Sequence, residues 1–179
     1  MSGTSGIKNQ LLTYFEYFMV CSFLGWIYES IWWNMIEENK GFLNRGFLFG
    51  PWIPIYGVGI VLILLAIKAV HARSGLSIFC VAVIVSTVTE LLGSYMMEMV
   101  TGSFMWDYTG YFGNFQGRIA VKPDLMFGFL TVLVYFGVLP KLKSYQEGNQ
   151  KLRTGIDVGL GVLFAADFVR SLAALSPAP

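Results

Sequence analysis

The sequence predicts an all-α, polytopic transmembrane helical bundle with about five spans, and three observations lead to that prediction. Apolar residues make up 55% of the 179 residues and charged residues only 13%, about half of the ~25% that is usual in soluble domains. The mean hydropathy is +0.62. The apolar residues gather in stretches close to the ~20 residues that a helix needs to cross the hydrocarbon core. A small soluble domain exposes much of its surface and needs charge to cover it, so lipid is the expected solvent here.

Five stretches are predicted to cross the membrane within a single transmembrane domain, residues 1–179. They cover about residues 17–36, 53–70, 76–100, 125–139 and 156–175. Pro140 is expected to end the fourth, because proline cannot continue a regular helix. Asp167 and Arg170 interrupt the fifth, which makes it the weakest of the five.

Two connections between these spans are unusual. Residues 37–52 (the first loop) and 101–124 (the second loop) are rich in Gly, Trp, Phe, Tyr and Asn. This composition suits segments that lie at the membrane interface or re-enter it partly under cover of protein. Prolines and glycines in residues 44–57, from the end of the first loop into the start of the second span, forbid a regular helix and leave backbone groups that need partners. The residues singled out there are Gly46, Gly50, Pro51, Pro54, Tyr56 and Gly57.

The distribution of basic residues predicts the orientation. With five spans, one side holds seven of them: Lys8, Lys68, Arg73, Lys141, Lys143, Lys151 and Arg153. The other side holds four: Lys40, Arg45, Arg118 and Lys122. Because the more basic side faces the cytoplasm, we expect a cytoplasmic N-terminus and both loops outside, in a bacterial cytoplasmic membrane. If the fifth span lies flat at the interface, the C-terminus stays inside.

Three acids at membrane depth are the main candidates for function. Glu29, Glu90 and Asp167 occupy three different spans. At about 1.5 Å per residue they lie about 10, 15 and 12 Å inside the outer boundary. An ionisable group in lipid costs at least ~2.5–3.5 kcal/mol, so such groups should face the protein interior, a water-filled cavity or a cationic partner. Arg45 and Arg118 are the expected partners, and Trp26 and Asn114 complete the candidate set.

Three interpretations of these acids stay open. They form a polar network that fixes helix packing, they bind or move a small polar or charged solute, or they catalyse a reaction on lipid or envelope precursors. The formal net charge of +1 excludes a general basic surface for nucleic acid. The sequence holds no Gly-rich phosphate loop, Cys/His cluster or nucleophile elbow. We therefore expect no metal and no cofactor, and the sequence nominates no catalytic residue, so that an intramembrane enzyme remains the second alternative.

The motifs around these residues resemble one protein family. They are Gly25-Trp26 with Tyr28-Glu29, Arg45-Gly46-Phe47-Leu48 with Gly50-Pro51, Pro54-Ile55-Tyr56-Gly57 with Gly59, Glu90, Trp106-Asp107-Tyr108, Asn114 and Gly117-Arg118-Ile119. Together they resemble the small bacterial membrane proteins catalogued as putative ABC-transporter permeases of type IV, the CmpB-like group. The resemblance covers about residues 14–140 and weakens beyond Pro140. Lys122-Pro123-Asp124 departs from the more apolar family pattern and leaves the start of the fourth span open.

The resemblance implies a membrane-embedded transport component. The chain has no P-loop, so a separate ATP-binding subunit would supply any ATP hydrolysis. Five spans are few for enclosing a pathway, so a homo-oligomer is a further expectation. The alternative is a scaffold, sensor or envelope-associated protein that transports nothing and in which the acids are structural.

Overall fold

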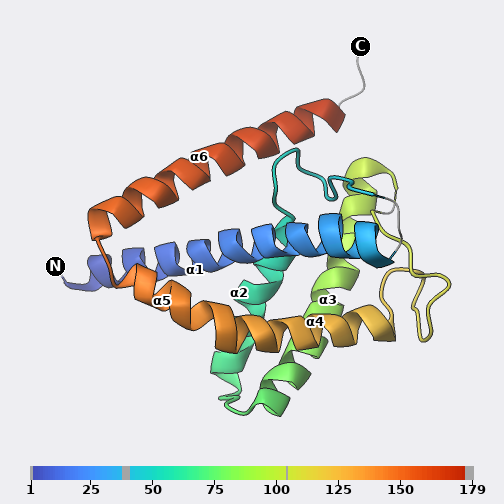
Figure 1. Ribbon diagram of the computed structural model, residues 1–179, viewed down its shortest axis with the longest axis horizontal. Helices are drawn as coiled ribbons and strands as arrows, with labels where there is room; N and C mark the ends of the chain where they lie inside the picture. Colours follow the sequence, from blue (N-terminus) through green and yellow to red (C-terminus); the bar gives the residue numbers. More distant parts are fainter. Residues whose placement is uncertain (1, 38–40, 104, 176–179) are drawn as a thin grey trace. The chain divides into compact units, whose positions relative to one another are not determined.

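The computed structural model describes residues 2–37, 41–103 and 105–175, and it is all-helical, which confirms the predicted fold class (Figure 1). Its elements are α1 (Ser2–Ile27), the π-helix η1 (Tyr28–Glu37), α2 (Pro54–Ala69), α3 (Gly75–Thr101), α4 (Val121–Leu133), the π-helix η2 (Val134–Val138), α5 (Leu139–Gln146) and α6 (Gln150–Leu175). Within the described ranges, extended pairing is limited to an isolated antiparallel bridge between Phe115 and Ile119.

Within the residues that the structure describes, four helical segments are long and apolar enough to cross a membrane. They are Asn9–Trp32, Gly75–Thr101, Val121–Gln146 and Gln150–Leu175. The fifth apolar helix, Pro54–Ala69, has 16 residues, or about 24 Å against a hydrocarbon core of about 30 Å. Large apolar side chains such as Leu76 (74% exposed) cover the outside of these helices, whereas many buried side chains are polar. This distribution suits lipid as the solvent, because lipid accepts apolar surface and rejects unpaired polar groups.

The chain divides into two compact units, each of which is described by itself. The first combines Met1–Gly57 with Lys143–Pro179, and the second is Val58–Leu142. In the first unit, α1 contacts α6 through an edge-to-face pair of Phe18 and Phe164, with ring centroids 5.3 Å apart. The first loop returns from η1 toward the C-terminal half of α6 (Figure 1).

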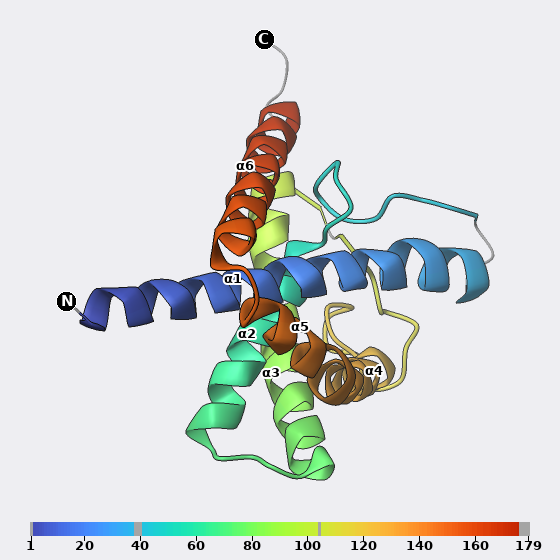
Figure 2. The ribbon, with the colours of Figure 1, turned by 60° about the vertical axis from the view of Figure 1, so that its left-hand side comes forward.

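The second unit is built on the α2–α3 hairpin and on the packing of α3 against α4 (Figure 2). Ile63 and Ile67 of α2 pack against Ile78 and Ala82 of α3. At Gly128 the two helices α3 and α4 come so close that an added Cβ would lie 2.5 Å from Val83 Cγ2. Small residues at such crossings let helix backbones approach in a membrane.

The fourth span differs from the expectation at both ends. Its helix begins at Val121 rather than near residue 125, because Pro123 lies in the first turn, where a missing N–H breaks no hydrogen bond. The helix also continues through Pro140 to Gln146 instead of ending there. The wider π-helical turn η2 ends at Val138, two residues before Pro140. Such turns rearrange the hydrogen bonds that a proline would otherwise break.

Candidate functional site

The three predicted acids fall into different units. Glu29 and Asp167 belong to the first unit and Glu90 to the second. Each lies in a polar cluster of its own, and the partners come from the two irregular loops and from the first turn of α2. The clusters are therefore described one at a time.

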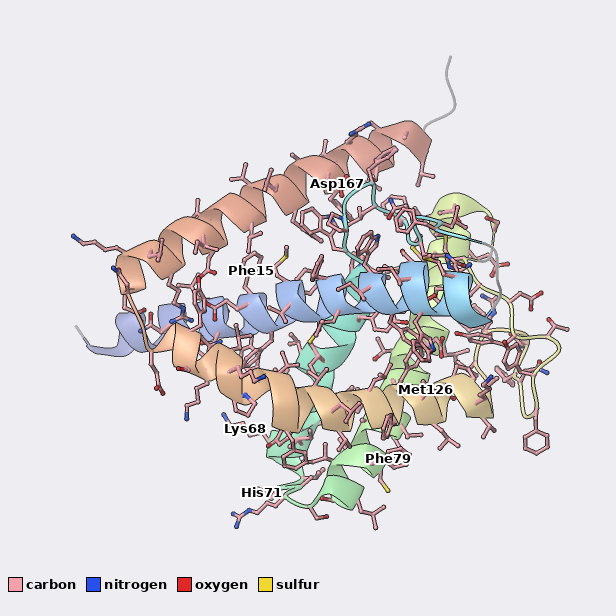
Figure 3. The ribbon with its side chains drawn as sticks, in the orientation of Figure 1. Phe15, Lys68, His71, Phe79, Met126 and Asp167 are labelled. Atoms are coloured by element: carbon pink, nitrogen blue, oxygen red, sulfur yellow. The ribbon has the colours of Figure 1, made fainter. Side chains whose placement is uncertain are left out.

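The Asp167 carboxylate on α6 holds the first loop. It accepts hydrogen bonds from the backbone N–H groups of Phe49 (3.2 Å) and Gly50 (2.8 Å). The indole N–H of Trp52 donates a third bond at 2.7 Å. In Figure 3, Asp167 faces this loop. Three donors on one carboxylate satisfy a charge that would otherwise be expensive within an apolar helix.

The local sequence explains why the loop can bend around Asp167. Gly46 has φ +100°, a left-handed conformation that favours glycine. A Cβ at Gly50 would lie 2.6 Å from the Trp52 indole, so only glycine fits there. Pro51 separates these two residues, and the Trp52 N–H donates to the Gly50 carbonyl at 2.9 Å. The glycines and the proline predicted to matter here thus shape the turn that presents N–H groups to α6.

Glu29, in η1, is part of a second cluster. The Tyr56 hydroxyl donates to Glu29 Oε1 at 2.5 Å. Arg45 Nη2 lies 3.6 Å from Glu29 Oε2, so one of the two arginines predicted as partners lies beside this acid. Tyr56 reaches Glu29 because Pro54 starts α2 immediately before it. A Cβ at Gly25 would lie 2.3 Å from the Tyr56 ring, so the small residue on α1 leaves room for the tyrosine.

Two further candidates hold the first loop and the first turns of α2 against α1. The Trp26 indole N–H donates to Asn44 Oδ1 at 2.5 Å, and Asn44 Nδ2 donates to the Phe49 carbonyl at 3.0 Å. A Cβ at Gly57 would lie 2.6 Å from the Phe18 carbonyl oxygen. Both contacts fix the positions of backbone segments, so Trp26 and Gly57 help to position the residues that form the cluster of Glu29 and Arg45.

Glu90, on α3, forms the third cluster together with Tyr108 and Asp124, both of which the sequence analysis had placed in the second loop. Glu90 is 5% exposed, and the Tyr108 hydroxyl donates to its Oε1 at 2.9 Å. Asp124, in the first turn of α4, is 8% exposed. Its carboxyl group lies within hydrogen-bonding reach of Thr87 and of Glu90. Two buried carboxyl groups from two helices therefore meet inside the second unit.

Arg118 is buried farther along α3 from this pair. It is 6% exposed, donates to Ser94 Oγ at 2.9 Å, and forms an ion pair with Glu98. Its guanidinium also lies 4.0 Å from the ring centroid of Tyr95. The Trp106 indole N–H donates to the Arg118 carbonyl at 2.9 Å. These contacts hold the second loop against the C-terminal half of α3.

Asn114 has a conformational role in the second loop. Its Nδ2 donates to the carbonyls of Thr109 and Tyr111 at 3.0 Å each. Its Oδ1 accepts from the Gly117 N–H at 3.2 Å. All the polar atoms of its amide are thereby used to close the turn that positions Arg118.

A fourth cluster was not anticipated from the sequence. Arg153 of α6 (4% exposed) donates to Glu16 of α1 (5% exposed) through Nε at 2.6 Å and Nη2 at 3.1 Å. Gln146 Nε2 donates to the same Glu16 at 2.6 Å, and Arg153 Nη2 donates to Thr13 Oγ1 at 3.1 Å. Asp157 Oδ2 lies 4.0 Å from Arg153 Nε.

The sequence analysis missed this cluster because it began the first and fifth spans too late in the sequence. Glu16 falls one residue before the predicted first span, and Arg153 was assigned to a polar connection. Both lie inside long helices. The spacing of Arg153 and Asp157 by four residues is the available signal, since it places opposite charges on one helix face.

The donor chemistry gives no support for a metal centre. Within the part of the chain that the structure describes, no group of three or more His, Cys, Asp or Glu side chains is arranged to hold a metal ion. The functional groups in the four clusters are mainly carboxyl, guanidinium and phenol groups on or beside apolar helices.

Comparison with known protein families gives one match. The sequence profile of the family described as putative ABC-transporter type IV matches residues 16–172. The chain belongs to this family. The match covers all four clusters and extends through α6, so the family relationship does not stop at Pro140. Neither the curated proteins nor the solved structures give a significant match. Family membership and the apolar helices together fit a membrane transport protein.

Proposed function

We propose that this family member is the membrane-embedded component of a transport system that moves a small polar or charged solute across the bacterial cytoplasmic membrane. The observation that supports the proposal is the burial of ionisable groups within apolar helices. Each such group costs at least ~2.5–3.5 kcal/mol in lipid, so a chain that carries several has a use for them. The family description supports the same class of function.

The meeting of Glu90 and Asp124 favours a solute-handling role over a purely structural one. A contact between two carboxyl groups adds little to helix packing, because like charges repel when both are ionised. We therefore place the solute-handling chemistry in the second unit, with Arg118 as the nearby cation.

The same proposal includes the partners. The chain has no P-loop, so a separate subunit binds ATP. The five predicted spans are too few to enclose a wide pathway, so a homo-oligomer surrounded by the lipid bilayer is part of the proposal. The N-terminus is placed in the cytoplasm, following the basic-residue count.

The alternative, a membrane scaffold without transport, has two observations in its favour. Asp167 is engaged by three donors of the first loop, which is the arrangement expected of a structural clasp. Glu29 is likewise engaged by Tyr56 and Arg45. These two acids fit a role in fixing loops, whichever function the second unit has.

Affinity purification in a mild detergent tests the proposal. The tagged full-length protein is recovered from its native membrane and its companions are identified by mass spectrometry, with an unrelated multi-span protein carrying the same tag as the control. Stoichiometric recovery of an ATP-binding subunit supports the transport function. Recovery of the protein alone, or with envelope-assembly proteins, contradicts it and favours the scaffold.

Single neutralising variants then separate the roles of the acids. Asp167→Asn and Glu29→Gln should lower the thermal stability of the purified protein, because they weaken clasps that hold the first loop. Glu90→Gln should leave the thermal stability of the purified protein unchanged. In the co-purified complex, the same variant should abolish the change in ATP hydrolysis rate that a membrane fraction containing the solute causes with the wild-type protein. Loss of stability in Glu90→Gln equal to that in Asp167→Asn would assign Glu90 a structural role instead.

A further inference from the structure

We propose that the cluster of Glu16, Arg153 and Asp157 is a proton-binding site, in which Asp157 carries an exchangeable proton while Glu16 forms the ion pair with Arg153. The site joins the start of α6 to α1, and it holds the two helices together best when the proton is bound. All its members lie in the first unit. The site needs neither a solute nor an ATP-binding subunit, so it goes beyond the proposed transport function and does not depend on it.

The guanidinium of Arg153 is fully used by groups other than the second acid. Arginine has five N–H donors. Nε and Nη2 donate to the two carboxylate oxygens of Glu16 at 2.6 and 3.1 Å, and Nη2 also donates to Thr13 Oγ1 at 3.1 Å. Nη1 donates to the Gln146 carbonyl and to Gln150 Oε1, at 3.4 Å each. These contacts engage all five donors, so another carboxylate beside this arginine receives none.

Asp157 is that second carboxyl group. Its Oδ2 lies 4.0 Å from Arg153 Nε, the same nitrogen atom that binds Glu16 Oε1 at 2.6 Å. A separation of 4.0 Å is too long for a hydrogen bond. Asp157 is 3% exposed, and its Oδ2 is buried without a hydrogen-bond partner among the described residues. An orphaned buried oxygen of this kind is rare in folded proteins and indicates a bound proton, ion or water.

The balance of buried charges favours a proton on one of the two acids. Glu16, Arg153 and Asp157 are 5%, 4% and 3% exposed, so ionisation of both acids leaves one negative charge uncompensated in apolar surroundings. Neighbouring buried carboxyl groups avoid this cost when one of them keeps its proton. The Glu16 carboxylate accepts two hydrogen bonds from Arg153 and one from Gln146 at 2.6 Å. Asp157 Oδ2 accepts none, so the proton belongs to Asp157.

The other titratable groups on the neighbouring helices supply no second cation. They are Tyr14 and Tyr17 of α1, Lys141, Lys143 and Tyr145 of α5, Glu147 of the turn before α6, and Lys151 of α6. The three lysines are exposed, and the ion pairs of the cluster among the described residues are those with Arg153. The phenols are neutral at physiological pH. A metal cation beside Asp157 would be repelled by the guanidinium, so a proton is the ion that fits.

Proton binding is thereby linked to the attachment of α6. This helix begins beside α1 (Figure 1), where the cluster joins the two. Farther along, the helices meet through Phe18 and Phe164, whose contact carries no charge. Release of the proton adds a second negative charge to the cluster and weakens the attachment at the start of α6 alone. The folded chain therefore binds this proton more strongly than the unfolded chain does.

Infrared spectroscopy of the full-length protein in lipid nanodiscs tests whether Asp157 carries the proton. At neutral pH the wild-type protein should show the C=O stretch of a protonated carboxyl group, and Asp157→Asn should remove the intensity of one such group. Asp167→Asn is the matched control on the same helix, because the Asp167 carboxylate accepts three N–H bonds and should add nothing to the band. A band that is unchanged in Asp157→Asn overturns the proposal.

Glu16→Gln tests the charge balance with Asp157 still in place. Without the Glu16 carboxylate, Arg153 has a single acid to pair with, so Asp157 should ionise and the carboxyl band should fall as far as in Asp157→Asn. Persistence of the band in Glu16→Gln shows that the proton does not depend on the ion pair, and it overturns the proposal. This variant also decides the question if Asp157→Asn does not fold.

The pH dependence of unfolding, followed by circular dichroism in mixed micelles, provides a second measurement. Between about pH 5 and 7 an unfolded chain has released the proton of an ordinary aspartate, which titrates at ~3.9, whereas the folded chain keeps it on Asp157. One proton of difference raises the unfolding constant about tenfold per pH unit. The ratio of the wild-type to the Asp157→Asn unfolding constant should therefore rise about tenfold per pH unit. Parallel pH profiles of the two proteins refute the proposal.

Discussion

Replacing Arg153 with methionine should lower the free energy of unfolding of the first unit. The loss should be larger than that caused by replacing an exposed residue of α6. Arg153 is 4% exposed and makes two bonds to Glu16, at 2.6 and 3.1 Å. It also lies 4.0 Å from Asp157, which is 3% exposed. Arg153→Met removes the cation from two buried acids. Removing one partner of a buried ion pair costs about 3–5 kcal/mol, because the remaining charge stays desolvated.

The cause can be separated from the loss of packing. Adding Glu16→Gln and Asp157→Asn to Arg153→Met removes both acids that have lost their cation and should recover most of the lost stability. Coupling energies of about 0.5–3 kcal/mol are usual for residues within one network. Arg170→Met is the matched control on the same helix, because Arg170 is exposed and stacks over Phe49 at 4.2 Å from the ring centroid. An exposed contact of this type contributes about 0.5–1 kcal/mol.

The assay is equilibrium unfolding in mixed micelles, followed by helical circular dichroism. The reasoning requires that Arg153→Met loses clearly more stability than Arg170→Met and that the triple variant regains it. If Arg153→Met behaves like Arg170→Met, the cluster of Glu16, Arg153 and Asp157 does not hold α1 and α6 together. If the triple variant is the least stable of all, packing rather than charge is what Arg153 contributes.

Two further predictions concern other parts of the chain. Gly57→Ala should lower the free energy of unfolding by about 1–3 kcal/mol in the same assay, because the added Cβ would lie 2.6 Å from the Phe18 carbonyl oxygen. Gly59→Ala is the control: no atom lies within 4 Å of its Cβ, so the higher helix propensity of alanine should raise the free energy of unfolding by up to about 1 kcal/mol. Equal effects of the two substitutions would show that the close approach at Gly57 is not tight. Hydrogen bonds from the Thr109 hydroxyl and N–H hold the pKa of Asp107 below its ordinary value of 3.8. Because this pKa is lowered on folding, the carboxylate stabilises the second loop above the ordinary value, and that stabilisation is lost as the pH falls through the lower folded value. Thr109→Val should move the pKa back toward the ordinary value in a titration followed by NMR, and an unchanged titration would show that the hydroxyl has no such effect.

The sequence alone determined that this is a helical membrane protein with irregular aromatic loops, because long apolar stretches have few other stable solutions in lipid. It also selected Glu29, Glu90 and Asp167, since an acid within an apolar stretch is conspicuous whatever its partners are. The glycines and prolines of the first loop were equally visible, because the turn needs them locally.

Tertiary structure alone decided which groups meet. Asp167 lies 117 residues from Gly50, and Glu16 lies 137 residues from Arg153, so no local pattern connects them. Asp124 was assigned to the second loop because the fourth span was predicted to begin at residue 125, yet the helix begins at Val121 with Pro123 in its first turn, where proline breaks no hydrogen bond. Pairing of charges depends on helix crossings, which side-chain shape and close approach at residues such as Gly128 decide. The sequence therefore showed that buried charges need partners, and only the folded chain showed that Asp124 brings Glu90 a second acid.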